Sequence, residues 1–180
     1  MITWNVGLRT EGDCRDFIDD LADRLSNRIQ LSSDGLGHYA NAVKLAFGKN
    51  VDYGQVIKVY GADASEEKRY SPAVCTSCTT KAITGDPIDS LISTSYVERQ
   101  NLNIRMGMRR FTRLTNGFSK KLSNHIAAFA LYTMYYNYCR AHTTLTKEAE
   151  RKKATTPAMA AGLTDHVWTV EEMTAAIAGS

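Results

Sequence analysis

The chain has 180 residues, of which 43% are hydrophobic and 23% charged, which is typical of one globular domain that buries roughly 70% of its unfolded surface. This composition excludes disordered, collagen-like and coiled-coil proteins. The most apolar stretch, 126–138, is shorter than the roughly 18 apolar residues that a membrane span needs, so we expect no membrane association.

The charge is distributed unevenly along the chain. The formal net charge is +3, residues 1–30 carry four arginines against six acidic residues, and residues 97–121 carry seven basic residues against one acid. The first ten residues show no basic region followed by an apolar block, so no secretory signal is expected. We therefore expect a cytoplasmic location and reduced thiols on the four cysteines.

The first sixty residues alternate between strand and helix patterns. Alternating apolar residues predict a half-buried strand over 2–8, and apolar residues at every fourth position from Phe17 to Ile29 predict an amphipathic helix that starts near Asp13. A short strand over 28–33, a helix from Gly37 to Gly48 and a strand over 51–60 follow. This order predicts an α/β fold.

The second part of the chain is predicted to be mainly helical. Residues 61–92 show no sustained period and are expected to form an irregular insertion loop. Helices are expected over 96–111 and 118–142, the longer one with a buried stripe that contains Phe118, Leu122, Ile126, Phe129, Ala130 and Met134. A charged linker, a short helix from Pro157 to Gly162 and a last helix with a Thr169–Glu172 capping box complete the chain.

Two carboxylates occupy positions where ligands are often bound. Asp34 follows a short strand, at the edge where parallel sheets place ligands, and Glu98 lies in the first turn of a helix. Such carboxylates suit Mg²⁺ or Mn²⁺, and two ions about 4 Å apart can hold both oxygens of a phosphodiester exchange. The alternatives are a simple Asp-Gly turn at Asp34 and a helix-dipole partner at Glu98.

Basic residues follow Glu98 along the same predicted helix. Asn101, Arg105 and Arg109 stand three, seven and eleven residues after Glu98 and would share its face. Arginines on this stripe suit a phosphate backbone held over a metal. The alternative is a solvated cationic face.

Several segments resemble the catalytic region of DDE-type transposases of the insertion sequence one group. The resemblance covers nearly the whole chain, and the run from Ser93 to Lys121 is its most specific part. The other segments that carry it are Ser33-Asp34-Gly35, Tyr70-Ser71-Pro72, Tyr135-Tyr136-Asn137-Tyr138 with Arg140 and His142, and the stretch from Thr156 to Gly162.

This resemblance implies a ribonuclease H-like fold, in which a mixed sheet with flanking helices presents three acids to divalent metals. It implies DNA transposition by phosphoryl transfer, with transposon ends and target DNA as partners. Asp34 matches the second acid of the family, Glu98 the third, and Arg105 the basic residue that accompanies them. The resemblance also indicates candidate DNA contacts at Arg99, Asn101, Arg109, Arg110, Arg113, Lys120 and Lys121.

The first two strands of the family's fold, with its first aspartate, have no counterpart in this sequence. We therefore expect residues 1–145 to form a partial catalytic domain with an unpaired sheet edge, followed by a linker and helical tail over 146–180. A two-metal site of Mg²⁺ or Mn²⁺ is expected only with the missing aspartate. The chain is accordingly expected to be an incomplete transposase or, alternatively, a catalytically inactive remnant that binds DNA or full-length transposase, with a homodimer as a further option.

Other residues have weaker functional interpretations. Cys75 and Cys78 form half of a possible zinc site, but no second pair exists, so ordinary reduced thiols are expected. His125 and His142 are expected to pack in the core. The tyrosines of 132–138 are expected to bridge core and surface rather than to stack on bases.

Overall fold

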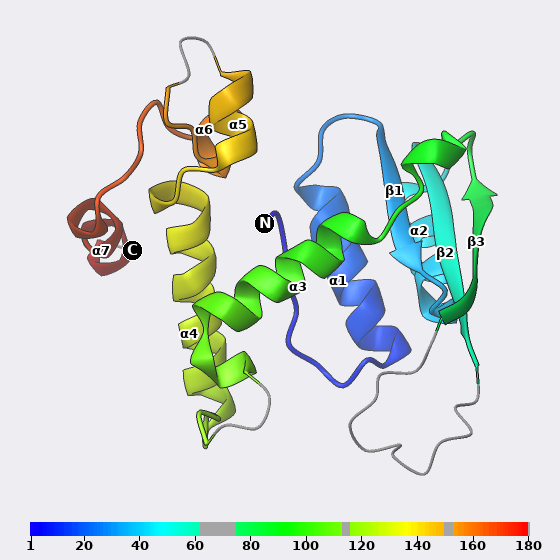
Figure 1. Ribbon diagram of the computed structural model, residues 1–180, viewed down its shortest axis with the longest axis horizontal. Helices are drawn as coiled ribbons and strands as arrows, with labels where there is room; N and C mark the ends of the chain where they lie inside the picture. Colours follow the sequence, from blue (N-terminus) through cyan, green and yellow to red (C-terminus); the bar gives the residue numbers. More distant parts are fainter. Residues whose placement is uncertain (62–74, 113–115, 150–152, 180) are drawn as a thin grey trace. The chain divides into compact units, whose positions relative to one another are not determined.

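The computed structural model of the protein describes residues 1–61, 75–112, 116–149 and 153–179 (Figure 1). The chain forms two compact units, one of residues 2–101 and one of residues 102–180 with Met1. Residues Tyr70, Ser71, Pro72 and Arg113, which entered the sequence interpretation, lie outside the described ranges.

The first unit is built around a three-stranded mixed sheet in the order β1-β2-β3, as Figure 1 shows. β1 (Ile29–Asp34) pairs in parallel with β2 (Val51–Tyr60), and β2 pairs antiparallel with β3 (Cys75–Thr84). A mixed α/β fold with flanking helices, as expected from the sequence, is therefore confirmed.

Two helices cover one face of this sheet. α1 (Glu11–Asp23) begins with a capping box between Thr10 and Asp13, and α2 (Gly37–Phe47) ends at Gly48. Their apolar sides meet the strands in one core cluster of buried residues, which contains Cys14, Ile18, Ala42, Val43, Val51 and Tyr53. The parallel connection from β1 to β2 thus runs through a helix that shares its core with α1.

The opposite face of the sheet is covered by the chain that leads into α3 (Ser95–Gly107). A 3₁₀ turn, η1 (Asp89–Leu91), precedes Ile92, which is 5% exposed. A Cβ atom at Gly54 of β2 would lie 2.5 Å from the Ile92 side chain, so only glycine lets this segment approach the strand so closely. The side-chain NH₂ of Gln30 also donates to the carbonyl of Ile88 at 3.0 Å, and the side-chain oxygen of Gln30 accepts from the N–H of Ile88 at 2.9 Å.

An ion pair fixes the start of the two parallel strands. Arg28, next to β1, donates from Nε and Nη2 to the carboxylate of Asp52 at 2.9 and 2.6 Å. Arg28 and the backbone N–H of Asp86 lower the pKa of Asp52 to about 2. The bond to Asp86 also ties the end of β3 to the same carboxylate.

Two predictions for the first unit were wrong. Residues 2–8 form no strand, because their polar side chains bond to α1 instead of to a neighbouring strand: Thr3 to Asp20 and Asn5 to the carbonyl of Asp13. The segment 61–92, expected to be irregular, contains the ten-residue strand β3. Most β3 side chains are exposed, so the strand rests on backbone pairing to β2 rather than on a hydrophobic pattern.

The second unit is helical. After the end of α3 come a 3₁₀ turn η2 (Arg109–Phe111), α4 (Leu122–Met134) and the π-helical turn η3 (Tyr135–Cys139). α5 (Thr143–Glu148), α6 (Pro157–Ala160) and α7 (Val170–Ala178) follow.

Aromatic rings form much of the core of this unit. Phe129 and Tyr136 are buried, and ring contacts connect Phe111, His125, Phe129, Tyr132, Tyr136 and His142. The packing roles expected for His125 and His142 are present in part, because both rings contact aromatic neighbours but both residues are only half-buried. A Cβ atom at Gly107 would lie 2.6 Å from the ring of Tyr132, so the end of α3 approaches α4 closely only because this residue is glycine.

The helices of the second unit differ in part from the expected ones. α3 ends at Gly107 rather than near Phe111, and the helix expected over 118–142 is α4 followed by a π-helical turn. Its predicted buried stripe was wrong at Phe118, Leu122, Ile126 and Ala130, which are exposed, because the buried face carries Phe129, Thr133 and Tyr136. The expected linker after 146 contains the end of α5.

The last two predicted helices are confirmed. Thr156 caps α6 with a bond to the N–H of Met159, and Thr169 and Glu172 form the capping box of α7. Across the part of the chain that the structure describes, no helix has the length and apolar character required to cross a membrane.

The core of the first unit yields a stability prediction. Replacing Ile18, which is 2% exposed, with alanine leaves a cavity between α1 and the sheet and should lower the free energy of unfolding by about 2–5 kcal/mol. Leu45→Ala on α2, where the side chain is 56% exposed, should change it by less than about 1 kcal/mol. Urea unfolding followed by circular dichroism measures both, and equal losses would contradict the assignment of this core.

Candidate functional site at the sheet edge

Asp34 ends β1 at the carboxyl edge of the parallel strand pair. Its Oδ1 accepts a hydrogen bond from the N–H of Leu36 at 3.2 Å, which turns the chain toward α2. The residue is exposed. The turn expected for an Asp-Gly pair is therefore present, and the carboxylate that forms it also faces solvent.

Glu98 lies in the first turn of α3, as predicted, and is held by two neighbours. Its Oε1 accepts hydrogen bonds from the Lys58 ammonium and, at 2.8 Å, from the Thr94 hydroxyl. The bond from Lys58, followed by that from Thr94, lowers the pKa of Glu98 below its ordinary value of 4.5. Glu98 in turn raises the pKa of Lys58.

The strand register brings Asp34 and the Lys58–Glu98 pair to the same edge of the sheet. Asp34 pairs with Val56 across the two parallel strands, and Lys58 lies two residues farther along β2. Lys58 therefore projects from the same face of β2 as Gly54 and Val56, the face that Ile92 covers. Both carboxylates thus belong to the carboxyl end of the parallel pair, where open α/β sheets bind ligands.

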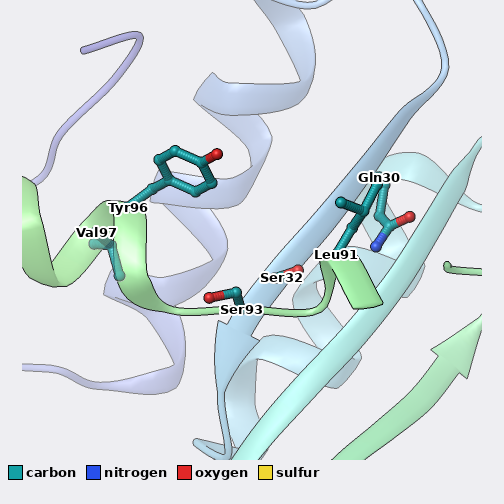
Figure 2. A pocket seen from close by; sticks show the side chains of 6 residues that line it. All are labelled: Gln30, Ser32, Leu91, Ser93, Tyr96 and Val97. Atoms are coloured by element: carbon teal, nitrogen blue, oxygen red, sulfur yellow. The ribbon is translucent and has the colours of Figure 1, made fainter. Parts of the chain in front are cut away.

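An open cavity of about 430 Å³ lies beside the first half of β1, on the amino-terminal side of Asp34. Its lining residues are Gln30, Ser32, Leu91, Ser93, Tyr96 and Val97. Figure 2 shows Gln30 and Ser32 on β1 and the other four on the chain that leads from η1 into α3. The cavity contains neither predicted carboxylate, so it is a neighbour of the candidate site rather than its centre.

The polar residues of α3 are placed only in part as predicted. Arg99, Asn101 and Arg105 lie on α3 and are exposed, and Arg105 stands two turns beyond Glu98. The helical alignment of Arg109 with Glu98 was wrong, because α3 ends at Gly107 and Met108 is extended. Arg109 is exposed in η2 instead.

The remaining DNA-contact candidates lie after η2. Arg110 donates to the Ser119 hydroxyl and, at 3.1 Å, to the carbonyl of Asn124, so it braces the start of α4. Lys120 and Lys121 are exposed immediately before α4.

The chemistry of the two carboxylates fits a hard divalent cation. Within the described part of the chain, one oxygen of each carboxylate accepts hydrogen bonds, and the other has no hydrogen-bond partner. Mg²⁺ is commonly bound through one or two carboxylates with water completing its shell. Over the same residues, no group of three or more His, Cys, Asp and Glu side chains is close enough to hold a metal. Asp34 and Glu98 therefore each keep one carboxylate oxygen that could accept a cation.

Cys75 and Cys78 lie on β3 as exposed free thiols. Cys78 pairs with Lys58 across the strands, and an irregularity in the register lies between Cys78 and Cys75. The Cys75 thiol donates a hydrogen bond to the carbonyl of Ser77 at 3.3 Å.

Sequence reasoning missed Lys58 and Thr94. A signal for Lys58 exists in the alternation of β2, since it continues the face of Gly54 and Val56 that packs against another element. A lysine at such a position requires an acceptor. Its partner is 40 residues away in sequence, so pattern alone cannot identify Glu98.

Comparison of the chain with protein-family models, with curated proteins and with solved structures finds no match.

The ion pair at Glu98 yields a titration prediction. Lys58→Gln should raise the pKa of Glu98 toward 4.5, because the neutral amide no longer favours the carboxylate. In the unchanged protein, the stabilisation from this pair is present above pH 4.5 and is lost as the pH falls through the lowered pKa of Glu98. Carbon-detected NMR of the side-chain carboxyl measures the pKa.

The matched control is Lys81→Gln on β3, which removes an equal charge elsewhere on the sheet. This control should leave the pKa of Glu98 unchanged within about 0.2 units. An equal rise in both variants would mean that total charge rather than the Lys58 contact lowers the pKa.

Proposed function

We propose that this chain carries part of the catalytic domain of a DDE-type DNA transposase with a ribonuclease H-like fold. The observation that carries the proposal is the placement of Asp34 at the end of a parallel strand and of Glu98 in the helix turn held at the same sheet edge. The resemblance in sequence assigns these two residues to the second and third acids of that family.

The proposed chemistry divides between the carboxylates and the basic residues. Asp34 and Glu98 would hold Mg²⁺ or Mn²⁺, which supplies Lewis-acid stabilisation of the oxygens in phosphoryl transfer. Arg105 and the neighbouring basic residues would bind DNA phosphates and orient the strand. Strand transfer is proposed only where a further carboxylate completes the site, because Asp34 and Glu98 match only two of the family's three acids.

The metal role is tested by replacing one ligand at a time. Asp34→Asn should weaken Mn²⁺ binding at least about tenfold, because it removes one of two charged ligands. The measurement is Mn²⁺-dependent broadening of backbone NMR signals of residues 34–36 and 97–99. The matched control is Asp23→Asn at the end of α1, which should not change the titration. Unchanged Mn²⁺ affinity in Asp34→Asn would refute the metal site.

A second candidate function is DNA binding without catalysis, as in a regulator that competes with or joins an active transposase. It is favoured by the exposure of Arg99, Arg105 and Arg109, since none of them takes part in an ion pair within the described ranges. Such guanidinium groups can bind phosphates without any metal.

DNA binding is tested through its salt dependence. Arg105→Gln and Arg109→Gln should each reduce the slope of log affinity against log salt by about 0.9, because each variant loses one phosphate contact. Fluorescence anisotropy with a duplex of about 20 base pairs measures the slope between about 50 and 200 mM salt. Arg15→Gln, which removes the partner of Asp19 on α1, serves as the control and should not change the slope.

The two functions separate in these experiments. DNA binding with the expected salt slopes, together with Mn²⁺ binding that depends on Asp34, supports the catalytic segment. DNA binding with the same slopes but without such Mn²⁺ binding supports the regulator. A DNA affinity that does not depend on salt concentration would contradict both candidate functions.

A further inference from the structure

Lys58 contacts the same carboxylate, Glu98, that the proposed function assigns to a metal ion. Its ammonium donates to Oε1 of Glu98, the oxygen that also accepts from Thr94. The nitrogen is thus a cation placed against a proposed metal ligand. This contact connects β2 to α3. Within the described residues, no other strand residue bonds to the Glu98 carboxylate.

We propose that the Lys58 ammonium exchanges partners. It pairs with Glu98 while no metal is bound, and it binds a DNA phosphate once a divalent cation binds Glu98. The inference rests on the proposed function and adds to it a phosphate-binding residue outside the basic segment 97–121. The ligand class is a phosphodiester oxygen of DNA.

The position of Lys58 restricts where its ammonium can move. The side chain starts from the sheet face that Val56 and Gly54 share and is 31% exposed. Its apolar stem is therefore partly covered, while the ammonium lies against Glu98 in the first turn of α3. Rotation of the long side chain moves the ammonium away from Glu98 without any change in the backbone.

Electrostatic repulsion and attraction explain why this exchange would link metal binding to DNA binding. An ammonium and a divalent cation at the same carboxylate repel each other, so Lys58 opposes metal binding in the absence of DNA. A DNA phosphate near the metal offers the displaced ammonium a new negative partner. Metal and DNA should therefore each favour the binding of the other through Lys58.

A purely structural ion pair leads to a different expectation. Glu98 is 56% exposed, and pairs between exposed side chains contribute little to stability. If Lys58 only positioned Glu98, its loss would misplace a ligand and weaken the binding of both metal and DNA. The exchange role instead requires opposite changes in the two affinities.

The test compares Lys58→Gln with Lys58→Arg and with the control Lys81→Gln. Without DNA, Lys58→Gln should bind Mn²⁺ about three to ten times more tightly than the unchanged chain, measured by broadening of NMR signals of residues 97–99. With Mn²⁺ and a duplex of about 20 base pairs, the same variant should bind DNA more weakly, with a salt slope reduced by about 0.9. Lys58→Arg should keep the DNA slope, and Lys81→Gln should change neither quantity.

The outcomes separate this inference from the proposed function. Weaker or unchanged Mn²⁺ binding in Lys58→Gln, while Asp34→Asn still abolishes it, overturns the exchange role and leaves the metal site intact. Tighter binding in Lys58→Gln with no effect of Asp34→Asn supports Lys58 as the competitor at Glu98 and overturns the paired metal site. An unchanged DNA slope in Lys58→Gln overturns the phosphate contact, and urea midpoints of all variants exclude general unfolding.

Discussion

The parallel pairing of β1 with β2 is the constraint on which the candidate site depends. Register from Ile29↔Val51 to Asp34↔Val56 places the carboxyl ends of both strands at one edge, so that the residues leaving β1 and the last residues of β2 lie together. The helix that connects two parallel strands must lie on a sheet face, and α2 shares that face with α1. The other face is left for the segment around Ile92, which Gly54 allows to approach, and α3 begins directly after it. The position of Glu98 is thus a consequence of how the sheet is covered.

Local signals predicted the elements whose stability is local or amphipathic. β1, α2 and β2 follow the predicted pattern, α1 follows it only as far as Asp23, and capping residues such as Thr169 predict where helices begin. The segment 2–8 failed because alternation predicts an extended backbone but cannot provide a partner strand, and Thr3 and Asn5 found partners on α1. β3 was missed for the opposite reason. Its sequence is polar and mostly exposed, and the strand forms through its backbone register with β2.

The positions of the candidate residues on strands and helices could be predicted in part, for the same reasons. Asp34 and Glu98 could be found because a strand end and a helix start are local features. Lys58 could not be paired with Glu98 from the sequence, since their contact depends on the packing of α3 over β2. The alignment of Arg109 with Glu98 assumed a helix that continues past residue 107. The close approach of Gly107 to Tyr132 and the extended backbone at Met108 end that helix first.

The spacing of charges on α3 explains why the partner of Glu98 comes from the sheet. A helical glutamate is usually neutralised by a basic residue three or four positions later, but here these positions hold Asn101 and Leu102. The next basic residue on its face, Arg105, is two turns away, about 10 Å along the axis. Glu98 therefore keeps its charge for a cation from outside the helix, and Lys58 supplies one. In the proposed function, the arginines of this helix would in the same way keep their charge for DNA phosphates, because the helix does not pair them with its own glutamate.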